Sequence, residues 1–146
     1  MASVSFSTIR SRFASAVDAL AGFTASRNPA DSGYRAPQSV AHLRYWVALG
    51  ESSGMQEDRQ RSADGIISET PIVVRFAYRL RPKDQILDYG NALDQTELVI
   101  RTLDTRGSPL YSDLQIRYDR MGVELVPSGE FVICSIFFIC LHTISF

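Results

Sequence analysis

Lysine, cysteine and a surplus of charge of either sign are what this 146-residue sequence has little of. Its 15 basic and 16 acidic residues leave a net charge of -1, whereas a dedicated nucleic-acid-binding domain carries an excess of basic residues. Nucleic acid is therefore not the expected partner. Only Lys83 among the basic residues is a lysine. Arginine supplies the rest, and it favours planar, bidentate pairing with carboxylates at interfaces, although a biased genomic base composition would produce the same surplus.

The two cysteines and the N-terminal residues both indicate the cellular compartment in which the protein is expected. Cys134 and Cys140 fall within one apolar run, where an extended chain would hold them about 20 Å apart, beyond the reach of a disulfide. We expect buried thiols in a reducing compartment. Serine and arginine interrupt residues 2–12, which therefore lack the apolar core of a signal peptide. Synthesis and retention inside a cell are expected.

Several motifs with a known chemical mechanism are missing. No Gly-rich phosphate loop, HExxH pair or CxxC pair occurs, so we expect no catalytic residues, no cofactor and no metal site. Cys134, Cys140 and His142 share one strand face, but their spacing is too wide for two thiolates to bind one zinc ion. His42 has no visible partner and is expected to be a satisfied, half-buried imidazole rather than a general base. An enzyme site assembled without local motifs stays open.

The first half of the chain predicts one helix and one strand between loops. Apolar residues at helical spacing predict an amphipathic helix over about 6–21, with Ser5 as its N-cap. Turn-forming residues predict an exposed loop over 24–39. Alternating residues predict a strand over 40–49. A polar tract without a core-forming pattern predicts a second exposed loop over 51–68.

The second half contains the clearest strand. Alternation over 70–80 predicts that strand, and apolar residues at three- and four-residue spacing predict a helix over 85–103, which Asp84 can cap. A third strand is expected over 114–119. The turn-forming residues at 126–129 are typical of a hairpin turn. The apolar run from Phe131 to Phe146 predicts a fourth strand.

The order helix, strand, strand, helix, strand, strand predicts an α+β fold, in which a four-stranded, mainly antiparallel sheet carries both helices on one face. Length and composition fit one domain over 1–146. The closing run is apolar on both faces: Phe131, Ile133, Phe137, Ile139 and Leu141 on one, and Val132, Cys134, Ile136, Phe138 and Ile144 on the other. Such a strand must be covered on both sides, so we expect another subunit to cover the face that the helices leave.

Element order and local sequence together resemble a known family over nearly the whole chain. The segments concerned are the amphipathic start Ile9 to Leu20, the strand, polar loop and strand from Leu43 to Leu80, the helix Gln85 to Leu103, and the closing hairpin from Arg117-Tyr118 through Pro127-Ser128-Gly129-Glu130-Phe131 to Phe146. In these segments the chain resembles the tail terminator proteins of long-tailed bacteriophages and related gene transfer agents.

This resemblance implies a virion structural protein without enzymatic activity, made in the host cytoplasm and located at the neck end of the tail. It implies a hexameric ring of identical subunits that caps the tail tube protein and meets the head-side connector or stopper protein. We assign contacts between rings to the charged loop and contacts within the ring to the sheet and closing strand. The candidate interface residues are Glu57, Asp58, Arg59, Arg61, Phe138 and Ile144. Arg75, Arg79 or Arg117 could face DNA in the ring lumen.

Other readings remain open. The chain could be another neck or tail-completion protein, or a small intracellular adaptor module that binds proteins as a monomer. A C-terminal membrane anchor is disfavoured, because the apolar run is shorter than the about 20 residues that a spanning helix needs and is rich in β-forming residues. We expect no membrane partner.

Overall fold

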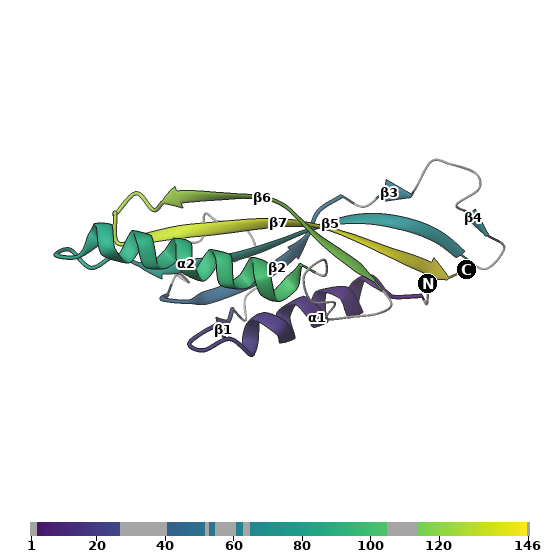
Figure 1. The fold of residues 1–146 in the computed structure, drawn as a ribbon, viewed down its shortest axis with the longest axis horizontal. Helices are drawn as coiled ribbons and strands as arrows, with labels where there is room; N and C mark the ends of the chain where they lie inside the picture. The colour runs from purple at the N-terminus through teal and green to yellow at the C-terminus, as the bar shows by residue number, and fades with distance from the viewer. Residues whose placement is uncertain are drawn as a thin grey trace.

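The computed structural model describes residues 3–26, 41–51, 53–54, 61–62, 65–104 and 114–145. Its elements are α1 (Phe6–Asp18), β1 (Thr24–Ala25), β2 (Arg44–Leu49), β3 (Ser53–Gly54), β4 (Arg61–Ser62), β5 (Gly65–Arg79), α2 (Gln85–Leu103), β6 (Gln115–Leu125) and β7 (Phe131–Ser145). The fold is α+β, and its two helices and four longer strands follow the predicted order (Figure 1).

The sheet is wider than predicted and mixed rather than four-stranded. Its strands follow the order β1-β2-β5-β7-β6, with β3 and β4 pairing with β5 off this path. The pairs β2–β5, β5–β7 and β6–β7 are antiparallel as expected, whereas β1 runs parallel to β2. The three short strands have two residues each, too few for an alternating pattern to appear in the sequence.

Strands β5 and β7 form the long spine of the molecule (Figure 1). Each has 15 residues, and they pair without a break from Gly65↔Ser145 to Arg79↔Phe131. The sequence placed the start of β5 at Thr70, five residues late. Gly65 allows the close approach at the far end, because a Cβ atom there would lie 2.5 Å from the carbonyl oxygen of Ile144.

Both helices begin near the predicted positions. Ser5 Oγ accepts from the backbone N–H of Thr8 at 3.2 Å, as expected for an N-cap, but α1 ends at Asp18 rather than near 21. Asp84 occupies the N-cap position of α2 without a side-chain capping bond. The carboxylate that acts at this helix start is instead Asp88, which accepts from the backbone N–H of Arg81 at 2.7 Å.

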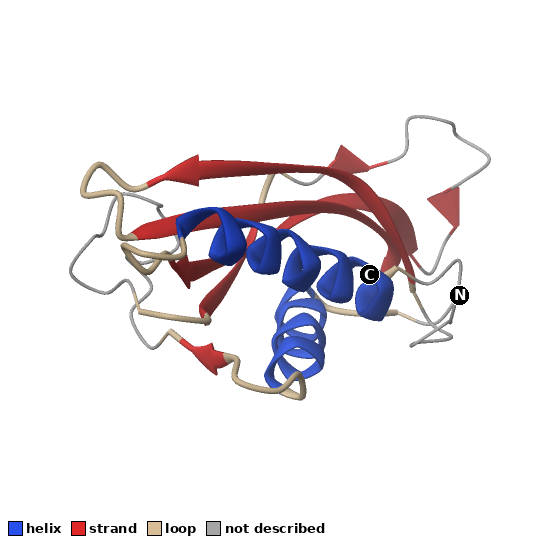
Figure 2. Cartoon of the chain, turned by 60° about the vertical axis from the view of Figure 1, so that its left-hand side comes forward, coloured by secondary structure: helices blue, strands red, loops and turns tan. Residues whose placement is uncertain are grey.

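The main core lies between the helices and one face of the sheet, as predicted (Figure 2). Helix α1 contributes Ile9, Phe13 and Val17, which are fully buried at successive turns. The sheet contributes every second residue of β7 and β5 to this core: Val132, Cys134, Ile136, Phe138, Cys140, Ile72, Val74 and Phe76. Because residues alternate between faces along a strand, the intervening residues lie on the opposite face of the sheet.

The start of the chain is held against the end of β7. Ser3 forms a bridge with Thr143, and the backbone N–H of Val4 donates to the Thr143 carbonyl oxygen at 2.9 Å. His142 is fully buried beside them, between the Val4 carbonyl oxygen and the Thr70 hydroxyl. The first and last described residues therefore lie side by side (Figure 1).

Candidate protein interface

The sheet face opposite the helices is the largest candidate for a functional surface. We call the part of it on β5, β7 and β6 the open face: Glu69, Pro71, Arg75, Ser135, Phe137, Ile139, Leu141, Arg117, Arg120 and Glu124. Its β7 residues Phe137, Ile139 and Leu141 are only half-buried. Neither α1 nor α2 covers this face, because both pack on the other side (Figure 2).

Phe137 lies at the centre of the open face between two arginines. The guanidinium carbon of Arg120 on β6 is 4.4 Å from the centre of the Phe137 ring, and that of Arg75 on β5 is 5.9 Å away. Arg75 also donates its Nε–H to Ser135 Oγ at 3.1 Å. Cation–π contacts of this kind orient the guanidinium groups over the ring, so the face presents fixed cations around an apolar centre.

A salt bridge spans the open face beside this cluster. Arg117 on β6 lies 3.8 Å from a carboxylate oxygen of Glu69 on β5, and their side chains are 56% and 40% exposed. Exposed ion pairs contribute little to folding stability. Both side chains therefore remain available to a partner at little cost to the fold.

One end of the same sheet face is covered by a small second cluster. Trp46, Ala77 and Ile133 are buried there, with Val126 and Phe131 packed against them. The indole N–H of Trp46 is buried and has no hydrogen-bond partner among the described residues, an arrangement that is rare in folded proteins. The half-buried row Phe137, Ile139 and Leu141 lies farther along β7, beyond this cluster.

Phe138 was predicted to make contacts between subunits, and this assignment is wrong for the folded chain. Its side chain is fully buried in the main core, with its ring edge-to-face on Phe13 at 5.7 Å. The closing run is apolar on both faces, so its pattern could not tell which face receives the helices. The partly exposed row is the other one, beginning at Phe137. Ile144 is half-buried opposite Ile66 on β5.

The predicted loop contacts are only partly within the described residues. Glu57, Asp58 and Arg59 lie outside them. Arg61 belongs to β4, where its backbone pairs with Ile66 of β5. The role of these four residues in joining rings stays a prediction.

Of the arginines proposed to face DNA, Arg75 and Arg117 lie on the open face, as their pairing with β7 requires. Arg75 is half-buried and engaged with Ser135 and Phe137. Arg79 is exposed at the end of β5. Their encounter with DNA remains a prediction.

The two cysteines are free, buried thiols, as predicted. Burial raises the pKa of Cys134 to about 11, despite a hydrogen bond with Thr96 that lowers it. The thiol is therefore protonated near neutral pH, and a protonated thiol is a poor nucleophile and metal ligand. Among the described residues, no group of three or more His, Cys, Asp or Glu side chains is arranged to hold a metal ion.

The sequence also contains a motif that resembles a catalytic one and was not predicted above. Gly50-Glu51-Ser52-Ser53-Gly54 has the G-x-S-x-G spacing of a serine-hydrolase nucleophile elbow. That elbow requires a strand, a sharp turn and then a helix. Here Gly50 follows β2, and Ser53 and Gly54 form β3, which pairs with β5. The spacing therefore lacks the structural setting of the motif, and Ser52 itself lies outside the described residues.

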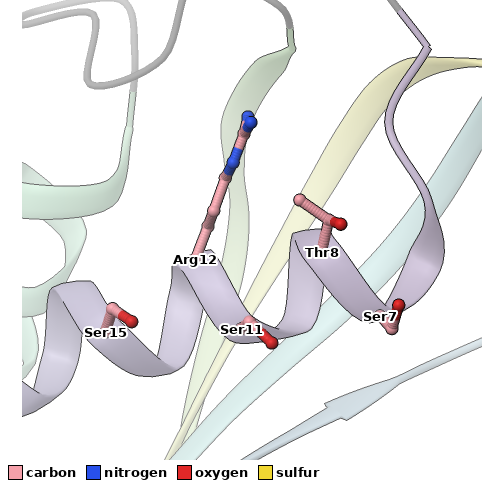
Figure 3. A pocket seen from close by; sticks show the side chains of 5 residues that line it. All are labelled: Ser7, Thr8, Ser11, Arg12 and Ser15. Atoms are coloured by element: carbon pink, nitrogen blue, oxygen red, sulfur yellow. The ribbon is translucent and has the colours of Figure 1, made fainter.

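A shallow groove of about 340 Å³ runs along the outer side of α1. Ser7, Thr8, Ser11, Arg12 and Ser15 line it, and Thr8 and Arg12 project to the same side of the helix (Figure 3). Thr8 accepts from Ser5 Oγ at 2.8 Å, so part of this hydroxyl row serves the helix cap. The lining is polar and open, which suits hydration better than the burial of a ligand.

Comparison with known proteins finds no protein-family model that matches the chain and no curated protein that matches its sequence. Within the described segments, neither helix is long and apolar enough to cross a membrane.

Proposed function

We propose that the chain is a structural subunit of tail terminator type, forming a hexameric ring at the neck end of a phage tail between the tail tube and the head-side connector or stopper. The observation that carries the proposal is the half-buried apolar row Phe137, Ile139 and Leu141 on the sheet face away from both helices. Burying such a row in a subunit contact contributes about 25 cal/mol per Å² of apolar area. The ring and its neighbours derive from the family resemblance.

A second copy of the chain could cover the open face with the exposed side of its helix α2. Ile86 and Leu87 in its first turn are 91% and 59% exposed, and Asp94 and Glu97 are exposed farther along the same helix. The exposed charged residues of α2 are Asp94, Glu97 and Arg101, which sum to -1. On the open face, Arg75, Arg117 and Arg120 exceed Glu69 and Glu124 by one positive charge. Such charge complementarity favours contact between the two surfaces and disfavours contact of either with itself.

A contact between two different surfaces of the same chain is heterologous. Helix α2 and the open face lie on opposite sides of the sheet (Figure 2), so each subunit can bind one neighbour on each side. Repeating such a contact generates a ring when the rotation closes. This geometry supports a ring better than a two-fold dimer.

Light scattering of the purified protein over a concentration series tests the proposal. We expect a discrete ring-sized oligomer, or a monomer that forms rings when tail tubes are added. Ile139→Asp should abolish the oligomer by placing a charge in the apolar row, whereas Ser11→Asp on the outer side of α1 should leave it intact. A monomer indifferent to concentration and to tubes would contradict the proposal and favour the adaptor reading.

Charge reversal tests the specific pairing of surfaces. Arg120→Glu and Glu97→Arg should each weaken assembly, because each places like charges opposite one another. The double variant should recover at least part of the assembly. Failure of recovery, with each single variant still defective and folded, would show that the open face binds a surface other than α2.

A further inference from the structure

A polar pocket of about 430 Å³ lies at the start of α2, away from the open face, and serves no role described above. Its lining comes from four parts of the chain: the turn before β2, the end of β5, the segment before α2, and α2 itself. The lining residues are His42, Tyr78, Arg79, Arg81, Asp88 and Asn91. Its volume falls within the range of about 300–1,000 Å³ that is typical of small-ligand sites.

His42 presents a hydrogen-bond donor to this pocket. Its Nδ1 atom accepts the backbone N–H of Arg79 at 3.1 Å, so in the neutral ring the proton resides on Nε2. The imidazole is held edge-to-face against the ring of Tyr78, with 4.5 Å between ring centres. No described residue accepts from Nε2–H, and His42 is exposed, although the sequence predicted a satisfied, half-buried imidazole.

Two further polar groups in the pocket make no side-chain hydrogen bond to a described residue: the Tyr78 hydroxyl, which interacts electrostatically with Arg81, and the Asn91 side-chain amide. Both residues are half-buried. With His42 Nε2–H they supply three uncharged groups able to donate into one pocket. Donors that line one pocket suit a ligand oxygen that carries negative charge.

The charged residues of the pocket set the charge of that ligand. The buried carboxylate of Asp88 accepts from Arg81 Nε at 3.0 Å and Nη2 at 2.9 Å, so the two charges are paired. These hydrogen bonds hold the pKa of Asp88 below its usual value. Burial lowers the pKa of His42, the carboxylate of Asp88 partly opposes this shift, and the guanidinium of Arg79 adds to it more weakly. Arg81 also lies 3.7 Å from a carboxylate oxygen of Asp84. Among the described residues, Arg79 is therefore the cation of the pocket lining that no carboxylate pairs with.

We infer that this pocket binds the carboxylate group of a small monoanionic ligand through His42, Tyr78 and Asn91. One negative charge can pair with Arg79, whereas the second charge of a phosphate dianion would lie close to Asp88 without a cation to pair with. The inference is independent of the proposed ring, since every group in the pocket belongs to one chain.

Proton NMR of the histidine side chains tests the inference, because the chain has 2 histidines and His142 is buried elsewhere. Sodium acetate, sodium phosphate and sodium chloride are titrated into the protein at constant ionic strength. We expect acetate to shift the His42 resonance saturably and to raise its pKa, while His142 does not respond. No saturable response to acetate, or an equal response to chloride, would overturn the inference. Tighter binding of phosphate would overturn the assignment to a carboxylate.

Two tyrosine variants test whether the anion binds in this pocket. Tyr78→Phe keeps the ring against His42 but removes the hydroxyl, and it should weaken acetate binding roughly tenfold, as expected for a lost hydrogen bond to a charged group. Tyr118→Phe, on β6 beside Phe138, is the matched control and should bind as the unmodified protein does. Equal binding by all three proteins would show that the Tyr78 hydroxyl does not bind the anion and would overturn the assignment of Tyr78 to the site.

Discussion

The imidazole Nδ1–H of His142 donates to the carbonyl oxygen of Val4 at 3.0 Å, joining residues 138 positions apart. Since Nδ1 carries the proton, Nε2 accepts from the Thr70 hydroxyl at 2.8 Å. The ring of Phe6 covers the imidazole edge-to-face. A single neutral side chain thus ties the start of α1 to both spine strands.

This arrangement predicts a loss of stability on mild acidification. Burial lowers the pKa of His142 from its usual 6.5, and the pKa of His42 is lowered in the same way. The unfolded chain therefore binds more protons than the folded one below that value, so stability is fully present above pH 6.5 and falls as the pH drops toward the folded-state pKa. Urea unfolding between pH 8 and pH 5 should show this decline.

A variant separates His142 from the other titrating groups. His142→Gln removes the ionisable ring, so it should unfold at lower urea at pH 8 but lose less stability between pH 7 and pH 5 than the unmodified protein. Comparing the slopes, rather than the absolute stabilities, isolates the proton effect. An unchanged slope would mean that the imidazole is not the source.

A second prediction concerns the contact between β5 and β7 at Gly65. Gly65→Ala should destabilise the protein by about 1–3 kcal/mol, in the range of overpacking, because the new Cβ would lie 2.5 Å from the backbone carbonyl oxygen of Ile144 and 3.0 Å from the Thr143 methyl group. Gly122→Ala on β6 is the control, since nothing lies within 4 Å of its added Cβ. Equal urea midpoints for the two variants would contradict the close approach.

The thiols provide a third prediction. Cys134 and Cys140 are fully buried, and burial raises the pKa of Cys134 to about 11. Both should resist a thiol reagent such as Ellman's reagent at pH 8 in the folded protein and react in urea, where the thiolate becomes accessible. Rapid labelling of either thiol without urea would show that the α2 side of the sheet opens readily.

Most of the fold could be predicted from the sequence because its main elements carry strong patterns. The alternation in β5 and the three- and four-residue spacing in α2 are long enough to identify each element. The extension of β5 back to Gly65 and the short strands β1, β3 and β4 could not be predicted, since their residues are fixed by pairing with distant strands. Chain order alone also does not reveal that β1 runs parallel to β2.

The candidate sites were harder to predict because they depend on which face of the sheet the helices cover. An apolar pattern on both faces of β7 identifies a doubly buried strand but assigns neither face, and Phe138 was placed on the wrong side for that reason. The pocket around His42 assembles residues separated by more than 30 positions. No local motif marks such a site, and only the packing of α2 against the end of β5 brings its groups together.

The assignment of faces on β7 leads to a sharp test with two neighbouring phenylalanines. Phe138→Ala should destabilise the subunit by about 3–5 kcal/mol, because it leaves a cavity in the main core opposite Phe13. Phe137→Ala should cost less in urea unfolding, since its ring is only half-buried, but should weaken assembly in light scattering. If instead Phe137→Ala unfolds the monomer and Phe138→Ala impairs only assembly, the two faces of β7 are exchanged and the open face is not the surface that subunits bury.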